Sequence, residues 1–244
     1  MELAGRVALV TGGAVRVGRA LALALSAQGC GVVIHCHRSI EQARHLAALL
    51  RERGVGAWVV RAHLAGEASC RRVIHRAVES AGRLDILINN AAVFHRQGLG
   101  EADAAAWHEE LETNLVAPSL LTRYFAEVPG AAAIVNILDR RVSALDVGAV
   151  PYSVSKKALE YVTRLSALAL SPAIRVNAVA PGPVLAREAG TGRAARESAG
   201  RIPLARRPTS ADVADAVLFL LGNEAVTGQT LFVDGGQHLE ANHA

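Results

Sequence analysis

Short apolar runs alternate with stretches of helical period through the first part of the chain. The runs have the length of strands, and in the stretches apolar positions recur every three or four residues. They follow one another over residues 6–10, 16–28, 31–35, 41–53, 57–61, 67–81 and 84–88. This order predicts the succession β-α-β-α-β-α-β. Because the strand runs are apolar throughout, we expect both of their faces to be buried, as in a parallel sheet covered by helices.

The same alternation continues in the second part of the chain. Helical regions and strands are predicted in turn over 101–127, 132–138, 152–170, 174–178, 211–221 and 230–233. Between them, 181–208 is rich in Gly, Pro, Ala and Arg and is too short for a second domain, so we expect a loop or lid over the substrate. The 244 residues are therefore predicted to form one α/β domain, with a doubly wound parallel sheet of about seven strands.

Composition narrows the class of protein. The formal net charge is +4, but the basic residues are spread along the chain and aromatic residues make up only 4%, which favours a small anionic ligand over nucleic acid. No apolar run approaches the ~18 residues of a membrane span, and no leader pattern opens the chain, so we expect a cytoplasmic protein. The three cysteines lack C-x-x-C spacing, so neither a disulfide framework nor a metal site is expected.

A glycine-rich turn follows the first predicted strand. The segment 11–18 reads Thr-Gly-Gly-Ala-Val-Arg-Val-Gly. Glycines here let the chain turn sharply from strand to helix and let its backbone approach a pyrophosphate at the helix N-terminus. A tight connection without a ligand would have the same composition, so the turn alone does not decide the question.

The end of the second predicted strand indicates which nucleotide is bound. An acidic residue here would accept hydrogen bonds from the ribose of NAD. The segment 35–39 instead reads His-Cys-His-Arg-Ser, in which Arg38 and Ser39 suit a phosphate group. We therefore predict NADPH as the cofactor. The alternative is a solvated arginine at a strand end.

Tyr152 and Lys156 lie four residues apart in a predicted helix, so both side chains are expected on one helical face. A nearby cation favours the phenolate, so we expect Lys156 to lower the pKa of Tyr152 and to make it a proton donor or acceptor near neutral pH. A pair on the surface would show the same spacing.

Taken together, these motifs resemble the short-chain dehydrogenase/reductase family over nearly the whole chain. The matching segments are the turn at 11–18, Asn-Asn-Ala-Ala at 89–92, Asn114, Tyr152 with Lys156, Asn-Ala-Val-Ala-Pro-Gly at 177–182 and Val-Asp-Gly-Gly at 233–236. The resemblance implies a Rossmann-like domain and a homotetramer.

The same resemblance implies roles for individual residues. Lys156 would hold the hydroxyls of the nicotinamide ribose and acidify Tyr152, and Asn114 would support a water-linked proton relay. Asn90 and Ala91 would line the cofactor channel. The expected cofactor-binding residues are Gly12, Arg16, Val17, Gly18, His37, Arg38, Ser39, Asn90, Ala91, Tyr152, Lys156, Pro181, Gly182 and, at the carboxamide, Val184.

Two departures from the family pattern are informative. Arg16 stands where the family has a third glycine, and Asp139 stands thirteen residues before Tyr152, where the family has a serine. That serine stabilises a carbonyl oxygen that becomes an alkoxide, whereas an ionised aspartate would repel this charge. An aspartate suits a C=N bond, whose nitrogen gains a proton. The pattern therefore favours imine reduction, with Asp139 and Tyr152 supplying the proton.

Both departures occur in the pteridine reductases, which the chain also resembles in His-x-His-Arg-Ser at 35–39, in Phe94 and in Pro-Gly-Pro-Val-Leu at 181–185. This resemblance implies that Phe94 stacks on a pterin and that Arg16 reaches both cofactor phosphate and pterin. The expected substrate is a dihydropterin or dihydrofolate, and the expected substrate-binding residues are Arg16, Phe94, Asp139 and Tyr152.

Other features leave alternatives open. His63 stands where the family has an aspartate, Ala186 replaces a common threonine, and His95 is either a substrate contact or solvated. The arginines at 187, 193, 196, 201, 206 and 207 attract an anionic substrate tail or keep the lid soluble. A carbonyl reductase of the 3-oxoacyl type is the rival enzyme, with Ser143 in place of the missing serine. A non-catalytic NADPH sensor is the rival of another class.

Overall fold

A seven-stranded parallel sheet forms the centre of the computed structural model, which describes residues 1–184 and 201–240. Within these residues the strand order is β3-β2-β1-β4-β5-β6-β7. The strands are β1 (Val7–Val10), β2 (Gly31–Cys36), β3 (Ala57–Arg61), β4 (Ile86–Asn89), β5 (Ala133–Ile137), β6 (Arg175–Pro181) and β7 (Thr230–Val233). The predicted Rossmann-like fold is confirmed.

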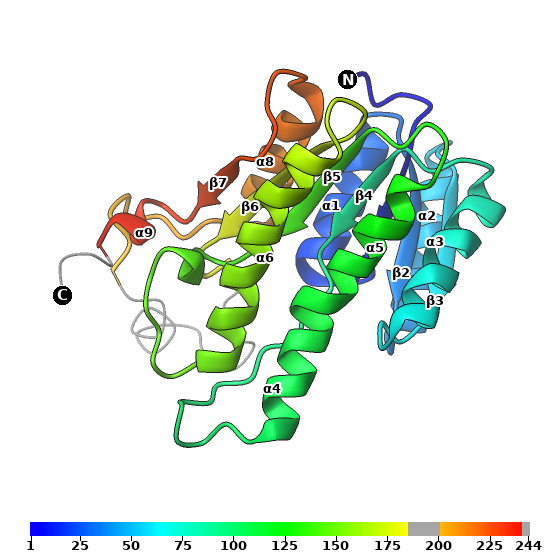
Figure 1. Ribbon diagram of the computed structural model, residues 1–244. Coiled ribbons are helices and arrows are strands. Elements are labelled where there is room, and N and C mark those ends of the chain that lie inside the picture. Colours follow the sequence, from blue (N-terminus) through cyan, green and yellow to red (C-terminus); the bar gives the residue numbers. More distant parts are fainter. Residues whose placement is uncertain (185–200, 241–244) are drawn as a thin grey trace.

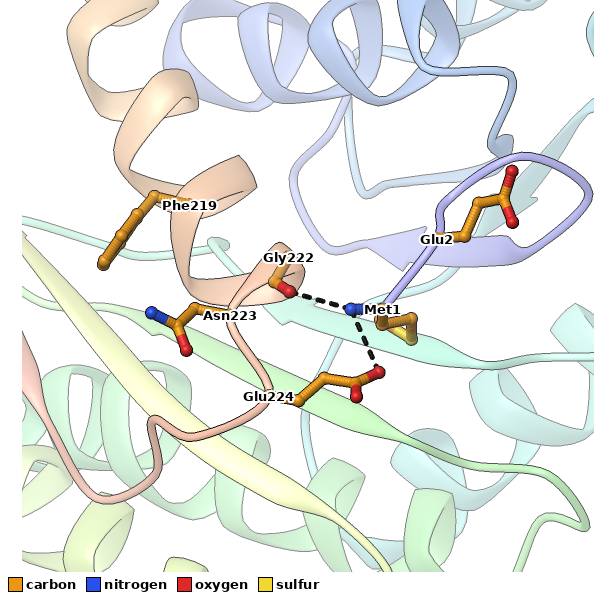
Figure 2. Close-up of a pocket in the computed structure, with 6 residues that line it drawn as sticks. All are labelled: Met1, Glu2, Phe219, Gly222, Asn223 and Glu224. Carbon is orange, nitrogen blue, oxygen red and sulfur yellow. Dashed lines mark hydrogen bonds and ion pairs between the residues drawn. The ribbon is translucent and has the colours of Figure 1, made fainter.

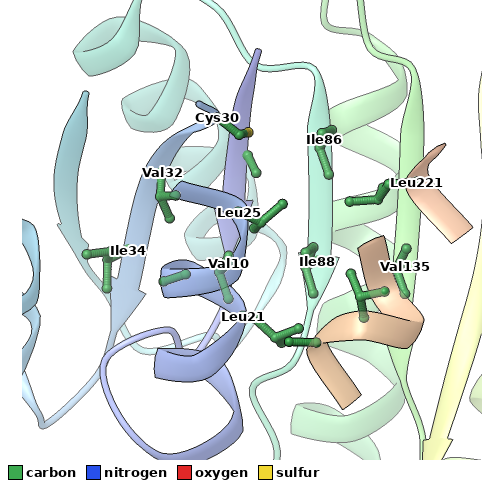
Figure 3. Close-up of a cluster of buried hydrophobic side chains, with 14 of the residues drawn as sticks. Val10, Leu21, Leu25, Cys30, Val32, Ile34, Ile86, Ile88, Val135 and Leu221 are labelled. Carbon is green, nitrogen blue, oxygen red and sulfur yellow. The ribbon is translucent and has the colours of Figure 1, made fainter. Parts of the chain in front are cut away.

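Helices cover both faces of the sheet (Figure 1). One face carries α1 (Arg16–Ala27), α2 (Ile40–Glu52) and α8 (Ser210–Gly222). The other face carries α3 (Glu67–Ala81), α5 (Ala117–Ala126) and α6 (Val150–Ala169). Successive side chains of a strand point to opposite faces, so in β1 Val10 joins the first layer and Leu9 the second. Figure 3 shows the first layer, where Leu21 and Leu25 of α1 pack over β1 and β4.

The predicted helical region 101–127 is divided in the structure. α4 (Ala104–Leu111) runs into a π-helical turn, η1 (Glu112–Val116), which continues into α5. Pro118 lacks the N–H that would pair with the carbonyl of Asn114, and this loss accounts for the irregular turn. A short 3-10 turn, η2 (Arg140–Val142), follows β5, and α9 (Gln237–Glu240) follows β7.

The N-terminus lies against the C-terminal end of α8 (Figure 2). The amino group of Met1 donates a hydrogen bond to the carbonyl of Gly222 at 2.8 Å and forms an ion pair with Glu224. The hollow beside it contains none of the predicted site residues. These contacts of the amino group hold Met1 against the end of α8.

None of the helices in the described part of the chain combines the length and the hydrophobicity that a membrane-spanning segment needs. No group of three metal-ligating side chains is found among those residues. Cys30, Cys36 and Cys70 are free and buried.

Candidate active site

The glycine turn after β1 is fastened to the loop after β4. The hydroxyl of Thr11 accepts hydrogen bonds from the backbone N–H groups of Asn90 and Ala91 at 2.9 and 3.0 Å. The side-chain amide of Asn90 donates to the carbonyls of Thr11 and Gly12. A Cβ at Gly18 would clash with the carbonyl oxygen of Gly12 and lie 2.7 Å from the amide nitrogen of Asn90, so only glycine fits there.

Arg16 begins α1 with a φ of 53°, a left-handed conformation that is unusual for a residue with a side chain. Strain of this kind persists only where the surroundings enforce it and is often found at functional sites. The exposed guanidinium of Arg16 lies at the N-terminus of α1, where no side chain caps the helix. This helix end therefore offers N–H groups and a cation to an anion.

His35 connects the glycine turn to β3, a role that the sequence analysis missed. Its Nδ1 accepts a hydrogen bond from the N–H of Gly12 at 3.2 Å, and its Nε2 lies 3.2 Å from the carbonyl oxygen of Ala62. Burial lowers the pKa of His35 to about 4, so the ring is neutral at physiological pH. The two contacts require the proton on Nε2. The sequence signal that could have indicated this role is a histidine within an otherwise apolar strand.

Basic side chains gather beyond the end of β2. His37 and Arg38 are exposed, and the His37 ring stacks on His63 with ring centres 4.4 Å apart. Partial burial lowers the pKa of His37, and the nearby charges of His63, Arg38 and Arg61 act in the same direction. A cavity of about 420 Å³ beside this pair is lined by Arg61, His63, Ser69, Arg72 and Arg76 among others. The surroundings suit an anionic phosphate.

The structure brings Asp139, Tyr152 and Lys156 together at the carboxyl end of β5. The Tyr152 hydroxyl donates a hydrogen bond to Oδ2 of Asp139 at 3.3 Å. Lys156 Nζ donates to the carbonyl of Ile137 at 2.8 Å and lies 5.9 Å from the centre of the Tyr152 ring. Both α6 side chains are buried. The predicted sharing of one site by Tyr152 and Lys156 agrees with this geometry.

The expected direction of the tyrosine pKa is wrong for this arrangement. Burial raises the pKa of Tyr152 well above 10, and the negative charge of Asp139 adds to the effect, which Arg141 opposes. Burial also lowers the pKa of Lys156 to about 8, against the influence of Asp139 and Glu110. The low-dielectric surroundings penalise the charged form of both groups. Tyr152 therefore keeps its proton and can donate it.

Arg141, which the sequence analysis did not single out, lies in the centre of the site. Its Nη1 contacts both carboxylate oxygens of Asp139 at 3.0 and 3.1 Å, and its Nε donates to Asp146 at 2.7 Å. Its guanidinium carbon is 5.2 Å from the centre of the Phe94 ring and 5.9 Å from that of Tyr152. Asp139 is therefore held in an ion pair beside the Tyr152 hydroxyl.

Phe94 presents a half-exposed ring beside Tyr152. The ring is T-shaped against Tyr152, with centres 4.7 Å apart, and Phe94 is 47% exposed. An apolar ring that is about half exposed and lies next to a proton donor can stack on a flat heteroaromatic. His95, the next residue, is exposed and faces Glu110.

Asn114 is fully buried in η1. Its amide nitrogen donates to the carbonyl of Val93 at 2.9 Å and lies 3.1 Å from the Ser155 hydroxyl, and its oxygen accepts from the N–H of Val93. Asn114 thus connects η1 to the loop after β4 and to α6. The π-helical turn places it there.

The loop after β6 lies against the segment that follows β7. A Cβ at Gly182 would lie 2.9 Å from the Cα of Asp234, so the close approach requires glycine, and the N–H of Val184 donates to the carbonyl of Gly182. Ser143 is exposed beyond η2. Arg201 and Arg206 form ion pairs with Glu240 and Asp212. The predicted lid is only partly described: Leu185, Ala186, Arg187, Arg193 and Arg196 lie outside the described residues.

Comparison with known proteins identifies the family. The short-chain dehydrogenase/reductase model described as Enoyl-(Acyl carrier protein) reductase matches residues 13–238. The chain belongs to the short-chain dehydrogenase/reductase family. It is therefore an oxidoreductase of the kind that uses a nicotinamide cofactor, as the sequence predicted.

Two relatives that are named for different activities are similar to this chain to a comparable degree. The chain is 38% identical to the Granaticin polyketide synthase putative ketoacyl reductase 2 of Streptomyces violaceoruber, with 96% of each chain covered. It is 34% identical to Pteridine reductase 1 of Leishmania tarentolae, again with 96% of each covered.

Among solved structures, FolM Alternative dihydrofolate reductase 1 from Brucella canis, complexed with NADP, is 36% identical, with a TM-score of 0.91 and coverage of 98% of this chain and 96% of that one. A blue fluorescent protein from a metagenomic library, in complex with NADPH, is 30% identical, with a TM-score of 0.90 and coverage of 97% and 99%. These structures confirm the predicted kind of cofactor.

Proposed function

We propose that this protein is an NADPH-dependent reductase that transfers a hydride to the C=N bond of a pterin, either a dihydropterin or dihydrofolate. One observation carries the proposal. The hydroxyl of Tyr152 donates to a carboxylate, Asp139, where the family has a serine, and the half-exposed ring of Phe94 lies against the same tyrosine. The first feature suits a substrate that gains a proton on nitrogen, and the second suits a flat ring.

The described residues fit the cofactor. The glycine cradle at Gly12 and Gly18, the uncapped N-terminus of α1 and the cations Arg16 and Arg38 together form a surface for anionic phosphates. NADPH supplies the hydride. Residues that would hold it are Gly12, Arg16, Val17, Gly18, His37, Arg38, Ser39, Asn90, Ala91, Lys156, Pro181, Gly182 and Val184.

In this proposal Tyr152 supplies the proton for the ring nitrogen. Burial raises its pKa, so the phenol stays protonated until a basic atom approaches its hydroxyl. Asp139 accepts from this hydroxyl and is paired with Arg141, so its role in the proposal is to orient the phenol. This refines the expectation that both residues supply the proton. In this proposal Lys156 and Asn114 would take part in the relay that restores the proton of Tyr152.

A carbonyl reductase is the second candidate, and a specific observation favours it. The guanidinium of Arg141 lies beside Tyr152, where a cation can offset the repulsion between Asp139 and a developing alkoxide. The 38% identical relative named as a ketoacyl reductase supports the same reading. Against it, two carboxylates already engage Arg141, which leaves it less able to stabilise a new anion.

Substrate tests separate the candidates. NADPH oxidation is measured with dihydrobiopterin, with dihydrofolate and with an acetoacetyl thioester. Turnover of a pterin or folate but not of the thioester supports the proposal, and turnover of the thioester alone overturns it. If none is reduced while NADPH binds tightly, the protein is a nucleotide-binding sensor and the enzyme proposal fails.

We also propose that the protein assembles as a homotetramer in the cytoplasm. Exposed apolar side chains on α6 support assembly, because a soluble monomer seldom presents such a row. They are Val154, Tyr161, Leu165 and Leu168. Light scattering at low protein concentration tests this proposal, and a monomeric mass would contradict it.

A further inference from the structure

A buried carboxyl group lies behind the active site at Glu110, in the last turn of α4. The residue is only 1% exposed, although a glutamate is almost never fully buried unless it is paired. It is not part of the chemistry proposed above. A buried acid has to be explained by what it holds in place.

Both oxygens of Glu110 accept hydrogen bonds. Oε1 accepts from the backbone N–H of His95 at 2.7 Å, and Oε2 accepts from the side-chain amide of Asn114 at 2.6 Å. Asn114 in turn holds the N–H and the carbonyl of Val93. Glu110 and Asn114 are four residues apart and lie on one face of the helix. Two side chains thus satisfy three backbone groups of the segment 93–95.

Phe94 lies between these clamped residues. Segment 93–95 belongs to no helix or strand, so its position depends on the contacts made by Glu110 and Asn114. The ring of Phe94 packs against Tyr152 with centres 4.7 Å apart. Glu110 contacts both the Asn114 amide and the backbone next to Phe94, so the position of the Phe94 ring depends on the position of the Asn114 amide.

The hydrogen-bond pattern requires a carboxylate with two accepting oxygens. Burial raises the pKa of Glu110, while the hydrogen bond from the His95 N–H, the charge of His95 and the Asn114 amide oppose the shift. The His95 ring places Nδ1 3.3 Å from Oε1 and Nε2 3.8 Å from Glu109. Across the site, Tyr152 and Lys156 on α6 are the titratable groups that feel the charge of Glu110.

We propose that Glu110 is a positioning residue of the reaction: it locks the loop carrying Phe94 to the buried Asn114, so that aromatic platform and relay residue are held in one arrangement. The proposal rests on the active site proposed above, but not on the substrate being a pterin. Any acceptor that the protein reduces reports on the loop.

The substitution Glu110→Gln tests this role, because it preserves size and removes one acceptor. A glutamine oxygen can still accept from the N–H of His95, but its NH₂ group then faces the NH₂ of Asn114. Two donors cannot pair, so Asn114 has to turn away and release Val93. We expect kcat to fall at least ~10-fold and KM for the acceptor to rise, with the Kd of NADPH changed by less than about twofold.

Control variants and a hydrogen-exchange measurement made without substrate accompany the Glu110→Gln test. Glu109→Gln makes the same change one residue earlier, at a side chain that is 57% exposed, and should leave kcat and KM within about twofold of the unaltered protein. Glu110→Asp keeps two accepting oxygens and should restore part of the activity. Hydrogen exchange of segment 93–95 should speed up in Glu110→Gln alone.

The outcomes are distinct. A folded Glu110→Gln protein with a lower melting temperature but unchanged kcat, KM and exchange overturns the proposal, because Glu110 would then serve stability only. An equal loss in Glu109→Gln or a matching loss of NADPH affinity also overturns it. If the unaltered protein reduces a ketone and no pterin, the proposed function fails, and the same comparison made with that ketone still tests Glu110.

Discussion

Replacing Asp139 with asparagine removes the charge that orients Tyr152 while keeping the size of the side chain. A hydrogen bond to a charged group contributes ~1.5–3 kcal/mol, and a factor of ten in rate corresponds to about 1.4 kcal/mol. The Tyr152 contact is long, at 3.3 Å, so the lower part of this range applies. We expect kcat for pterin reduction to fall ~10- to 30-fold in the folded variant.

The stability cost of this change should be moderate. The Asp139 and Arg141 side chains are 18% and 16% exposed, so the ion pair is partly buried. Arg141 keeps its contact with Asp146, and asparagine can still cap η2 by accepting from the N–H of Arg141. We therefore expect a loss of ~1–2 kcal/mol in the free energy of unfolding. NADPH affinity should hardly change.

The matched control is Asp146→Asn, which removes the other carboxylate on Arg141 and leaves the hydroxyl of Tyr152 bound to Asp139. It should cost similar stability with little effect on kcat. Steady-state rates on dihydrobiopterin and thermal melting compare the two variants. The reasoning is refuted by a folded Asp139→Asn protein with nearly full activity, or by an equal loss of rate in the control.

Three further predictions concern the cofactor and the buried lysine. Arg38→Asp should reverse a preference for NADPH over NADH of at least ~10-fold, since a charge-assisted phosphate contact is lost; equal kcat/KM for the two cofactors in the unaltered protein would remove the argument. Arg16→Gly should relieve the left-handed backbone and raise stability by ~1 kcal/mol while weakening NADPH binding, as melting and binding titrations will show; unchanged affinity would exclude Arg16 from the phosphate site. Between pH 8 and 10.5 Lys156 binds its proton more tightly in the unfolded chain, so its contribution makes stability rise with pH in this window, and Lys156→Met should remove that slope in urea unfolding. An unchanged slope would contradict the lowered pKa.

Local pattern predicted most of the architecture, because buried parallel strands and amphipathic helices leave strong periodic signals. The strands at 57–61 and 230–233 and the helix at 67–81 have the predicted bounds. The region 101–127 was predicted as one helical stretch, and its division at η1 depends on Pro118 and on the buried contacts of Asn114, which a periodicity does not reveal.

Only those residues of the candidate site that belong to a sequence motif could be predicted. The spacing of Tyr152 and Lys156 placed both on one face, but the direction of the Tyr152 pKa depends on how deeply the pair is buried and on Asp139, so it could not be read from spacing. Arg141 and Glu110 act through contacts with loops and helices that only the fold brings near. In the sequence each is an ordinary charged residue beside another of the same kind.

A competition assay tests the central claim most directly. The protein, NADPH and equal concentrations of dihydrobiopterin and an acetoacetyl thioester are combined, and the reduced products are quantified by mass spectrometry. If Asp139, Tyr152 and Phe94 form a site for a C=N bond in a flat ring, tetrahydrobiopterin should accumulate at least ~10-fold faster than the hydroxyacyl thioester. Faster formation of the hydroxyacyl product would contradict the account.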